Sequence, residues 1–186
     1  PWLWFLTRSA NCRIFAEQSV KDILQKVFED HGFSHEVKFE LSATHPKREY
    51  CVQYRETDFA FVSRLMEEEG IFYYFHHQPG KHELVVADAS TAYKDCPEGR
   101  IEYYPGDKAS DRLIRWDHDY EFRAGRWSHT DYNFETPANK LATESKTLRG
   151  MDDAGKYTLY NYPGGYAKTP NGDSIARIRM EQEEVS

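Results

Sequence analysis

The fold is decided by residues 50–75, which read YCVQYRETDFAFVSRLMEEEGIFYYF. The middle of this stretch has the period of an amphipathic helix, with an N-cap at Thr57 and a helix-ending glycine at Gly70. Strand-like segments lie on either side, at residues 50–54 and 71–75. The pattern predicts a strand, a helix and a strand in direct succession. The helix would bury one stripe of side chains, Phe59, Val62, Leu65 and Met66.

An earlier stretch repeats this arrangement. Ser19 and Gly32 have the same spacing as Thr57 and Gly70, and an apolar stripe lies between them. Strand candidates at residues 3–6 and 37–41 flank this first helix, and a further one lies at residues 84–87. The order β-α-β-β-α-β predicts an α+β fold, a split β-α-β-type sandwich over residues 1–88. The stripe of the first helix is Val20, Ile23, Leu24, Val27 and Phe28.

The hydrophobic pattern of the sequence changes after residue 88. Helical period disappears and turn signals recur, so residues 89–186 are predicted to form a second, β-barrel-like and strand-rich part. Its strand candidates are residues 112–116, 119–123 and 157–162, and a short helix over residues 174–184 is predicted to close it.

Composition excludes several classes of protein. The 186 residues carry 24 basic and 31 acidic side chains, a net charge of −7, which disfavours nucleic-acid and anionic-lipid partners. The three cysteines (12, 51 and 96) are widely spaced and contain no C-x-x-C, as in a reducing compartment. The apolar start Pro1–Leu6 has no basic segment before it, so it is interpreted as an interior strand of a larger protein rather than a secretory signal.

Catalytic and metal-binding patterns are weak. Nucleophile-elbow, P-loop and H-E-x-x-H motifs are absent from the sequence. His76, His77 and His82 form one histidine-rich cluster, and Asp117-His118-Asp119 another, but neighbouring side chains of a strand point to opposite faces. The prediction is therefore no catalytic residue, no metal, no cofactor and no small-molecule substrate.

An acidic run occupies an unfavourable position at a predicted helix end. Glu67, Glu68 and Glu69 end the second helix, where the helix dipole disfavours carboxylates. Either the run is a solvated acidic end, or one glutamate is buried against an arginine such as Arg55 and holds the helix to the sheet. The sequence leaves both interpretations open.

Residues 50–75 closely resemble the signature of the VgrG family, the trimeric spikes of bacterial type VI secretion systems. Further segments resemble the same family in the same order: residues 1–15, 131–137, 160–164 and 176–180. The signature residues, to which the resemblance gives a structural role, are Arg55, Glu56, Asp58, Arg64, Glu69, Gly70 and Tyr73.

The resemblance implies a phage tail hub or baseplate-like fold and a homotrimeric hub. That hub joins the secretion tube above to a needle below, delivers effectors, is assembled in the bacterial cytoplasm and is exported by the type VI apparatus. It also implies that the chain is the hub region of a longer spike protein, which continues into an OB-like domain near residue 186.

Two alternatives remain beside the structural hub of a type VI spike. One is a tail hub or baseplate protein of a contractile phage or a prophage-derived particle. The other is a metal-dependent hydrolase that uses Asp88, Asp117, His118 and Asp119. Aromatic residues are favoured at interface cores, so the possible interface residues are Tyr103, Tyr104 and Trp127.

Overall fold

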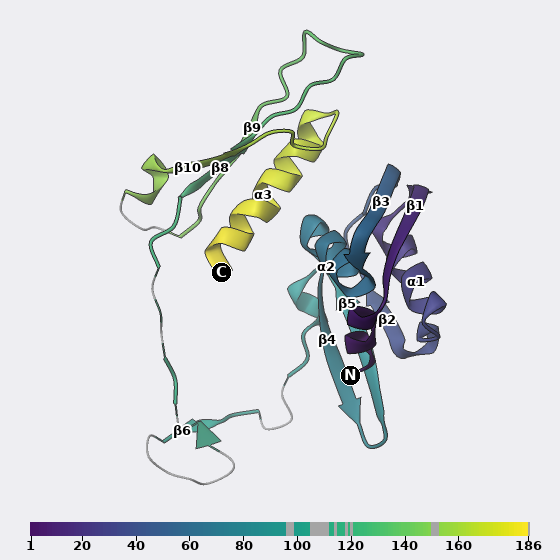
Figure 1. Ribbon diagram of the computed structural model, residues 1–186. Helices are drawn as coiled ribbons and strands as arrows, with labels where there is room; N and C mark the ends of the chain where they lie inside the picture. Colours follow the sequence, from purple (N-terminus) through teal and green to yellow (C-terminus); the bar gives the residue numbers. More distant parts are fainter. Residues whose placement is uncertain are drawn as a thin grey trace. The chain divides into compact units, whose positions relative to one another are not determined.

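The computed structural model of the chain describes residues 1–95, 99–104, 112–113, 115–117, 119, 121–149 and 153–185. These residues form two compact units, Pro1–Ala92 and Tyr93–Ser186, and each is described by itself (Figure 1). The boundary after residue 88, as a limit of separate domains, stays a prediction. No helix in the described ranges has both the length and the apolar character that a membrane crossing requires.

Unit 1 contains two α-helices, five strands and short 3-10 turns. Its α-helices are α1 (Val20–Asp30) and α2 (Asp58–Glu69). Its strands are β1 (Ala10–Gln18), β2 (Val37–Glu40), β3 (Arg48–Thr57), β4 (Phe72–Gln78) and β5 (Lys81–Ala87). The 3-10 turns are η1 (Trp2–Arg8), η2 (Ser34–Glu36) and η3 (Ser90–Ala92).

Both predicted helices of unit 1 are confirmed, together with their ends. Ser19 caps α1 in a reciprocal capping box with Asp22, and Gly32 follows the helix at φ +80°. Thr57 caps α2 by accepting a hydrogen bond from the third amide after it, and Gly70 ends α2 at φ +68°. A left-handed φ favours glycine because it has no Cβ, so these two glycines fix where the helices stop.

The strands of unit 1 form two sheets. β1 pairs with β3 in an antiparallel ladder, while β2, β5 and β4 form a second sheet in that order. Within the second sheet β2 is parallel to β5, and β4 and β5 form the long hairpin visible in Figure 1. The core of the unit is one cluster that joins η1, both helices and both sheets.

The predicted strand at residues 3–6 is wrong. This segment lies inside η1, where Trp2, Leu3 and Leu6 are buried. A short apolar run does not distinguish a strand from a helical turn. The first strand is β1, which the sequence did not reveal because Phe15 is its one fully buried residue.

Unit 2 contains a three-stranded sheet and a long helix. The sheet has the order β10 (Thr158–Asn161), β8 (Arg126–His129) and β9 (Thr143–Lys146), with β10 parallel and β9 antiparallel to β8. Helix α3 (Thr169–Val185) packs against β8 and β9 (Figure 1). Outside this sheet lie the short parallel pair β6 (Glu102–Tyr103) and β7 (Arg112–Leu113), and the 3-10 turn η4 (Ala154–Lys156).

The mixed α+β class and the closing helix are confirmed, but the barrel-like second part is wrong for the described residues. Both sheets of unit 2 are open. The predicted strand at 112–116 is limited to β7 among its described residues, and the described residues of 119–123 form no strand. The central strand β8 and the edge strand β9 are short and polar, so turn signals alone did not locate them.

Candidate functional site

The signature segment places a carboxylate at each end of helix α2. Asp58 is the first residue of the helix and Glu69 is the last. Each is held by basic side chains from other elements. We call the two clusters the N-terminal node (Asp58, Arg13, Gln53 and His31) and the C-terminal node (Glu69, Glu68, Arg48, His45 and Asp88).

The N-terminal node is built around a buried carboxylate. The Asp58 side chain is 2% exposed, and its Oδ1 accepts hydrogen bonds from Arg13 Nη2 at 2.5 Å and Gln53 Nε2 at 2.7 Å. Its Oδ2 lies 2.7 Å from His31 Nε2. Burial acts to raise the pKa of Asp58, but the hydrogen bonds from Gln53 and His31 and the charge of Arg13 outweigh it, so the pKa is lowered.

Asp58 therefore joins three elements to the start of α2. Arg13 lies on β1, Gln53 on β3, and His31 caps the end of α1. Gln53 is fully buried and satisfied, since its Oε1 accepts from Arg13 Nε at 2.8 Å while its amide nitrogen donates to Asp58. Removing one member of such a buried ion pair is costly, because the opposite charge that remains has lost its counter-charge.

The C-terminal node neutralises the acidic run. Arg48, on β3, spans two carboxylates, with Nη2 2.7 Å from Glu69 Oε1 and Nη1 2.6 Å from Glu68 Oε2. His45 lies between Glu69 and Asp88, 2.9 Å from Glu69 Oε2 and 3.0 Å from Asp88 Oδ2. The charge of Arg48 offsets the unfavourable position of the glutamates at the helix end.

The structure supports a partly buried ion pair at this helix end, but the arginine is Arg48 and not Arg55. Arg55 is exposed, has φ +53°, and stacks on the neighbouring Tyr54 ring at 5.1 Å. Among the described residues it has no carboxylate partner. Arg48 lies at the start of β3, where its guanidinium reaches the last residue of the helix.

The remaining signature residues support α2 along its length. Arg64 Nη2 lies 2.6 Å from Glu56 Oε1, and Nη1 lies 3.2 Å from Glu68 Oε1, so Arg64 ties the middle of the helix to the end of β3. Gly70 ends the helix. Tyr73, on β4, is partly exposed and makes an edge contact with Phe75.

A second feature of unit 1 is an uncovered apolar face. On the outer side of the β1–β3 ladder, three successive cross-strand pairs are apolar: Cys12 with Tyr54, Ile14 with Val52, and Ala16 with Tyr50. All six residues are exposed, and Ile14, Tyr50 and Tyr54 are each more than 60% exposed. We call these six residues the β1–β3 apolar face. The alternation of residues 50–54 is the signal in the sequence that points to it.

The interface residues predicted in unit 2 differ in exposure. Tyr103 and Tyr104 are both more than half exposed. Trp127 is half-buried, and its indole Nε1 donates a hydrogen bond to His129 Nδ1 at 3.4 Å. Trp127 is therefore less exposed than the two tyrosines, and the interface role of all three residues stays a prediction.

The metal candidates do not come together. Among the described residues, no group of three or more His, Cys, Asp or Glu side chains is placed to hold a metal ion. His77 pairs with His82 across the β4–β5 hairpin, and Asp88 is engaged in the C-terminal node. His118 and Cys96 lie outside the described residues. Cys12 and Cys51 are free thiols.

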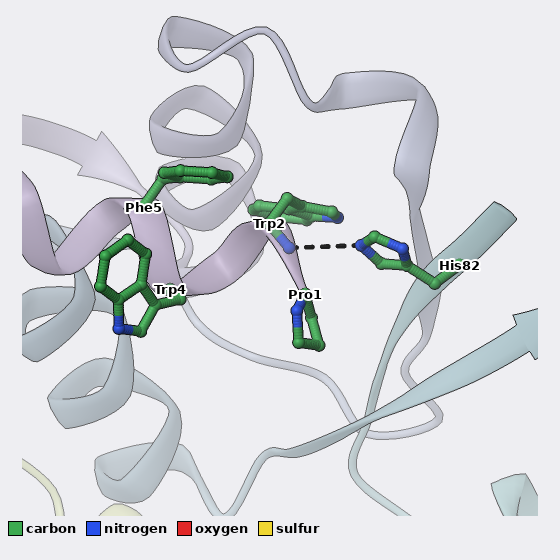
Figure 2. A pocket seen from close by; sticks show the side chains of 5 residues that line it. All are labelled: Pro1, Trp2, Trp4, Phe5 and His82. Carbon is green, nitrogen blue, oxygen red and sulfur yellow. Dashed lines mark hydrogen bonds between the residues drawn. The ribbon is translucent and has the colours of Figure 1, made fainter. Parts of the chain in front are cut away.

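One shallow apolar hollow lies at η1. Pro1, Trp2, Trp4, Phe5 and His82 line a volume of about 460 Å³. Figure 2 shows the backbone nitrogen of Trp2 donating to His82 Nε2, at 3.2 Å. This contact ties η1 to the β4–β5 hairpin.

The fold and its nodes define a structural module of mixed helix and sheet, in which a central helix is fixed at both ends and one sheet face is apolar and uncovered. The chain belongs to the phage tail baseplate hub family, whose family model matches residues 1–186.

Comparison with individual proteins agrees with this assignment. The chain is 45% identical to the type VI secretion system spike protein VgrG1c of Pseudomonas aeruginosa and covers 25% of it, with 97% of this chain aligned. It is 44% identical to VgrG1b of the same organism, with 97% of this chain and 25% of that protein covered. The chain thus spans about a quarter of the length of these relatives. The crystal structure of the prophage MuSo2 43 kDa tail protein from Shewanella oneidensis has the same fold, with a TM-score of 0.56 and 13% identity over 96% of this chain and 51% of that one.

Proposed function

We propose that this chain is a hub portion of a type VI secretion spike and that its role is mechanical. The observation that carries the proposal is its similarity, over 97% of its length, to proteins named as type VI spike proteins. The fixed helix α2 suits a part that transmits force, because ion pairs at both ends tie it to β1, β3 and the loop before β3. We propose no catalytic role for this part of the protein.

The assembled state we propose is a homotrimer. The β1–β3 apolar face supports this proposal, since contiguous exposed apolar rows on a sheet mark protein contacts, and a two-stranded ladder is marginal without further packing. We propose that a neighbouring subunit covers it. In this assembly the tube protein lies above the hub and the needle and effector domains lie below. The spike is assembled in the bacterial cytoplasm and exported by the apparatus.

Light scattering on the full polypeptide that carries this chain tests the assembly. The proposal predicts a mass of three subunits, and a strictly monomeric protein would contradict it. Placing a charge in the apolar face, with Ile14→Glu, is expected to reduce trimer formation. Gln78→Glu, at the exposed tip of the β4–β5 hairpin, is the matched control and should leave the mass unchanged. A trimer that is unaffected by Ile14→Glu would remove the apolar face from the interface and leave the trimer itself intact.

A second candidate function is the tail hub of a contractile phage or prophage-derived particle. The fold shared with the MuSo2 tail protein over 96% of this chain favours it. The neighbouring genes distinguish the two functions. Genes for the type VI membrane complex beside this one would support the spike, and a run of phage tail genes would support the tail hub.

A further inference from the structure

His45 is held at both ring nitrogens by carboxylates. It lies in the loop between β2 and β3, and its side chain is 8% exposed. Nδ1 is 2.9 Å from Glu69 Oε2, at the end of α2, and Nε2 is 3.0 Å from Asp88 Oδ2, directly after β5. Each carboxylate oxygen accepts a hydrogen bond, so this geometry requires a donor at both nitrogens.

Only the imidazolium form has two N–H groups. A neutral ring would turn one lone pair toward a carboxylate, unless that carboxyl carried the proton instead. Asp88 is poorly suited to do so, because its two oxygens also accept from the backbone amides of Ser42 and Ala43, at 2.7 and 2.8 Å. Glu69 is equally unsuited, since its other oxygen pairs with Arg48. The proton therefore belongs on His45.

We propose that His45 is a proton-dependent clamp that joins Glu69, at the end of helix α2, to Asp88, directly after strand β5. With the proton bound, the ring bridges α2 and Asp88. When the proton is lost, the Ser42 and Ala43 amides still hold the loop to Asp88, and Arg48 still holds α2 to β3. The link that opens is therefore the side-chain bridge from Glu69 to Asp88, while Gly70 and Ile71 still join α2 to β4 along the chain.

The charges around His45 agree with this assignment. The carboxylates that face the cluster are Glu68 and Glu69 from α2 and Asp88 from the end of β5; the cations are Arg48 from β3 and Arg64 from α2, with Lys47 exposed on the same loop. Burial acts to lower the pKa of His45, but the hydrogen bonds to Glu69 and Asp88 outweigh it and raise the pKa above its ordinary value of 6.5. The attachment is thus present below that value and is lost as the pH rises through the raised pKa.

His31 provides an internal comparison. It contacts Asp58 through Nε2 alone, so a neutral ring that donates from this nitrogen satisfies the contact. Arg13 supplies a permanent charge to the same carboxylate. The contacts of Asp58 are therefore predicted to persist at pH values that open the bridge between Glu69 and Asp88.

Hydrogen exchange of the chain at about pH 6 and about pH 9 tests the clamp, with protection corrected for the intrinsic exchange rate at each pH. We expect peptides from residues 41–47 and from the last turn of α2 to be several-fold better protected at the lower pH. In His45→Gln this difference should disappear. In His31→Gln, the matched control, it should persist. Peptides from α3 serve as the reference within the same molecule.

A second measurement does not depend on any variant. Nitrogen NMR of the His45 ring in the unaltered chain at about pH 7 should show two protonated nitrogens. A ring with one protonated and one unprotonated nitrogen at this pH would overturn the proposal, as would exchange that is equally protected at both pH values. Neither readout depends on trimer formation, so the clamp and the proposed hub function can fail separately.

Discussion

The two ends of helix α2 are both held by ion pairs, yet the helix dipole acts on their carboxylates in opposite directions. At the N-terminus a single buried carboxylate, Asp58, sits where the helix dipole favours it, and Arg13 compensates its charge. At the C-terminus two carboxylates sit where the dipole disfavours them. They are more exposed, 28% for Glu68 and 15% for Glu69. Position and burial, rather than the number of ion pairs, therefore set the expected cost of breaking each node.

The largest effect is expected at the N-terminal node. Asp58→Asn keeps the size of the side chain but leaves the partly buried Arg13 without its main partner, which should cost roughly 3–5 kcal/mol of unfolding free energy. Urea unfolding followed by tryptophan fluorescence measures this. In a Trp116→Phe, Trp127→Phe background the signal comes from Trp2 and Trp4 of unit 1. A decrease in the unfolding free energy of less than about 1 kcal/mol would contradict a large contribution of the N-terminal node to stability.

The same substitution has a predicted pH dependence. The pKa of Asp58 is lowered on folding, so its contribution is present above its ordinary value of 3.8 and is lost as the pH falls through the folded value. The destabilisation by Asp58→Asn should therefore shrink as the solution is acidified. A difference between the two proteins that stays constant from neutral pH to strong acid would contradict an ionised Asp58.

An intermediate effect is expected at the end of α2. Gly70 has φ +68°, and a Cβ in this conformation costs roughly 1–2 kcal/mol, so Gly70→Ala should destabilise unit 1 by about that amount. Gly70→Asn should recover part of the loss, because asparagine tolerates the left-handed region. Equal losses for both variants would mean that the conformation of Gly70 is not what limits the substitution.

The smallest effect is expected at the start of the helix. Thr57 accepts one hydrogen bond from the backbone amide of Ala60, and Thr57→Ala should cost about 1 kcal/mol. Thr57→Ser keeps the hydroxyl and is the matched control. If the serine variant loses as much as the alanine variant, the hydroxyl is not the stabilising group, and the methyl group of Thr57 matters instead.

Local signals predicted the helices well. The apolar stripes, the capping residues Ser19 and Thr57 and the two glycines all act within a few residues. The structure keeps them with one correction: in α2 the fully buried aromatic residue is Phe61, and the predicted Phe59 is only partly buried. The β1 strand was missed because most of its side chains are exposed. Residues 3–6 were misjudged because a short apolar run fits a buried turn as well as a strand.

The nodes could be predicted only in part. The sequence singled out Asp58 and Glu69 through the family resemblance but left open whether a cation pairs with the acidic run. It named Arg55 as an example of such a cation and missed Arg48, because the contact of Arg48 with Glu69 is made by the tertiary fold and no local pattern marks it. His31, His45 and Gln53 were not singled out, because their partners are brought near by the tertiary fold and no local pattern marks them.

A double-mutant cycle on Arg48 and Glu69 tests the central claim, that an ion pair fixes the C-terminal end of α2 to β3. With Arg48→Met and Glu69→Gln in the same fluorescence background, the account predicts a coupling energy of roughly 1–3 kcal/mol. The parallel cycle on Arg55 and Glu69 should give a coupling near zero. A coupling for Arg48 and Glu69 that is within error of zero, or no larger than that for Arg55 and Glu69, would contradict the account.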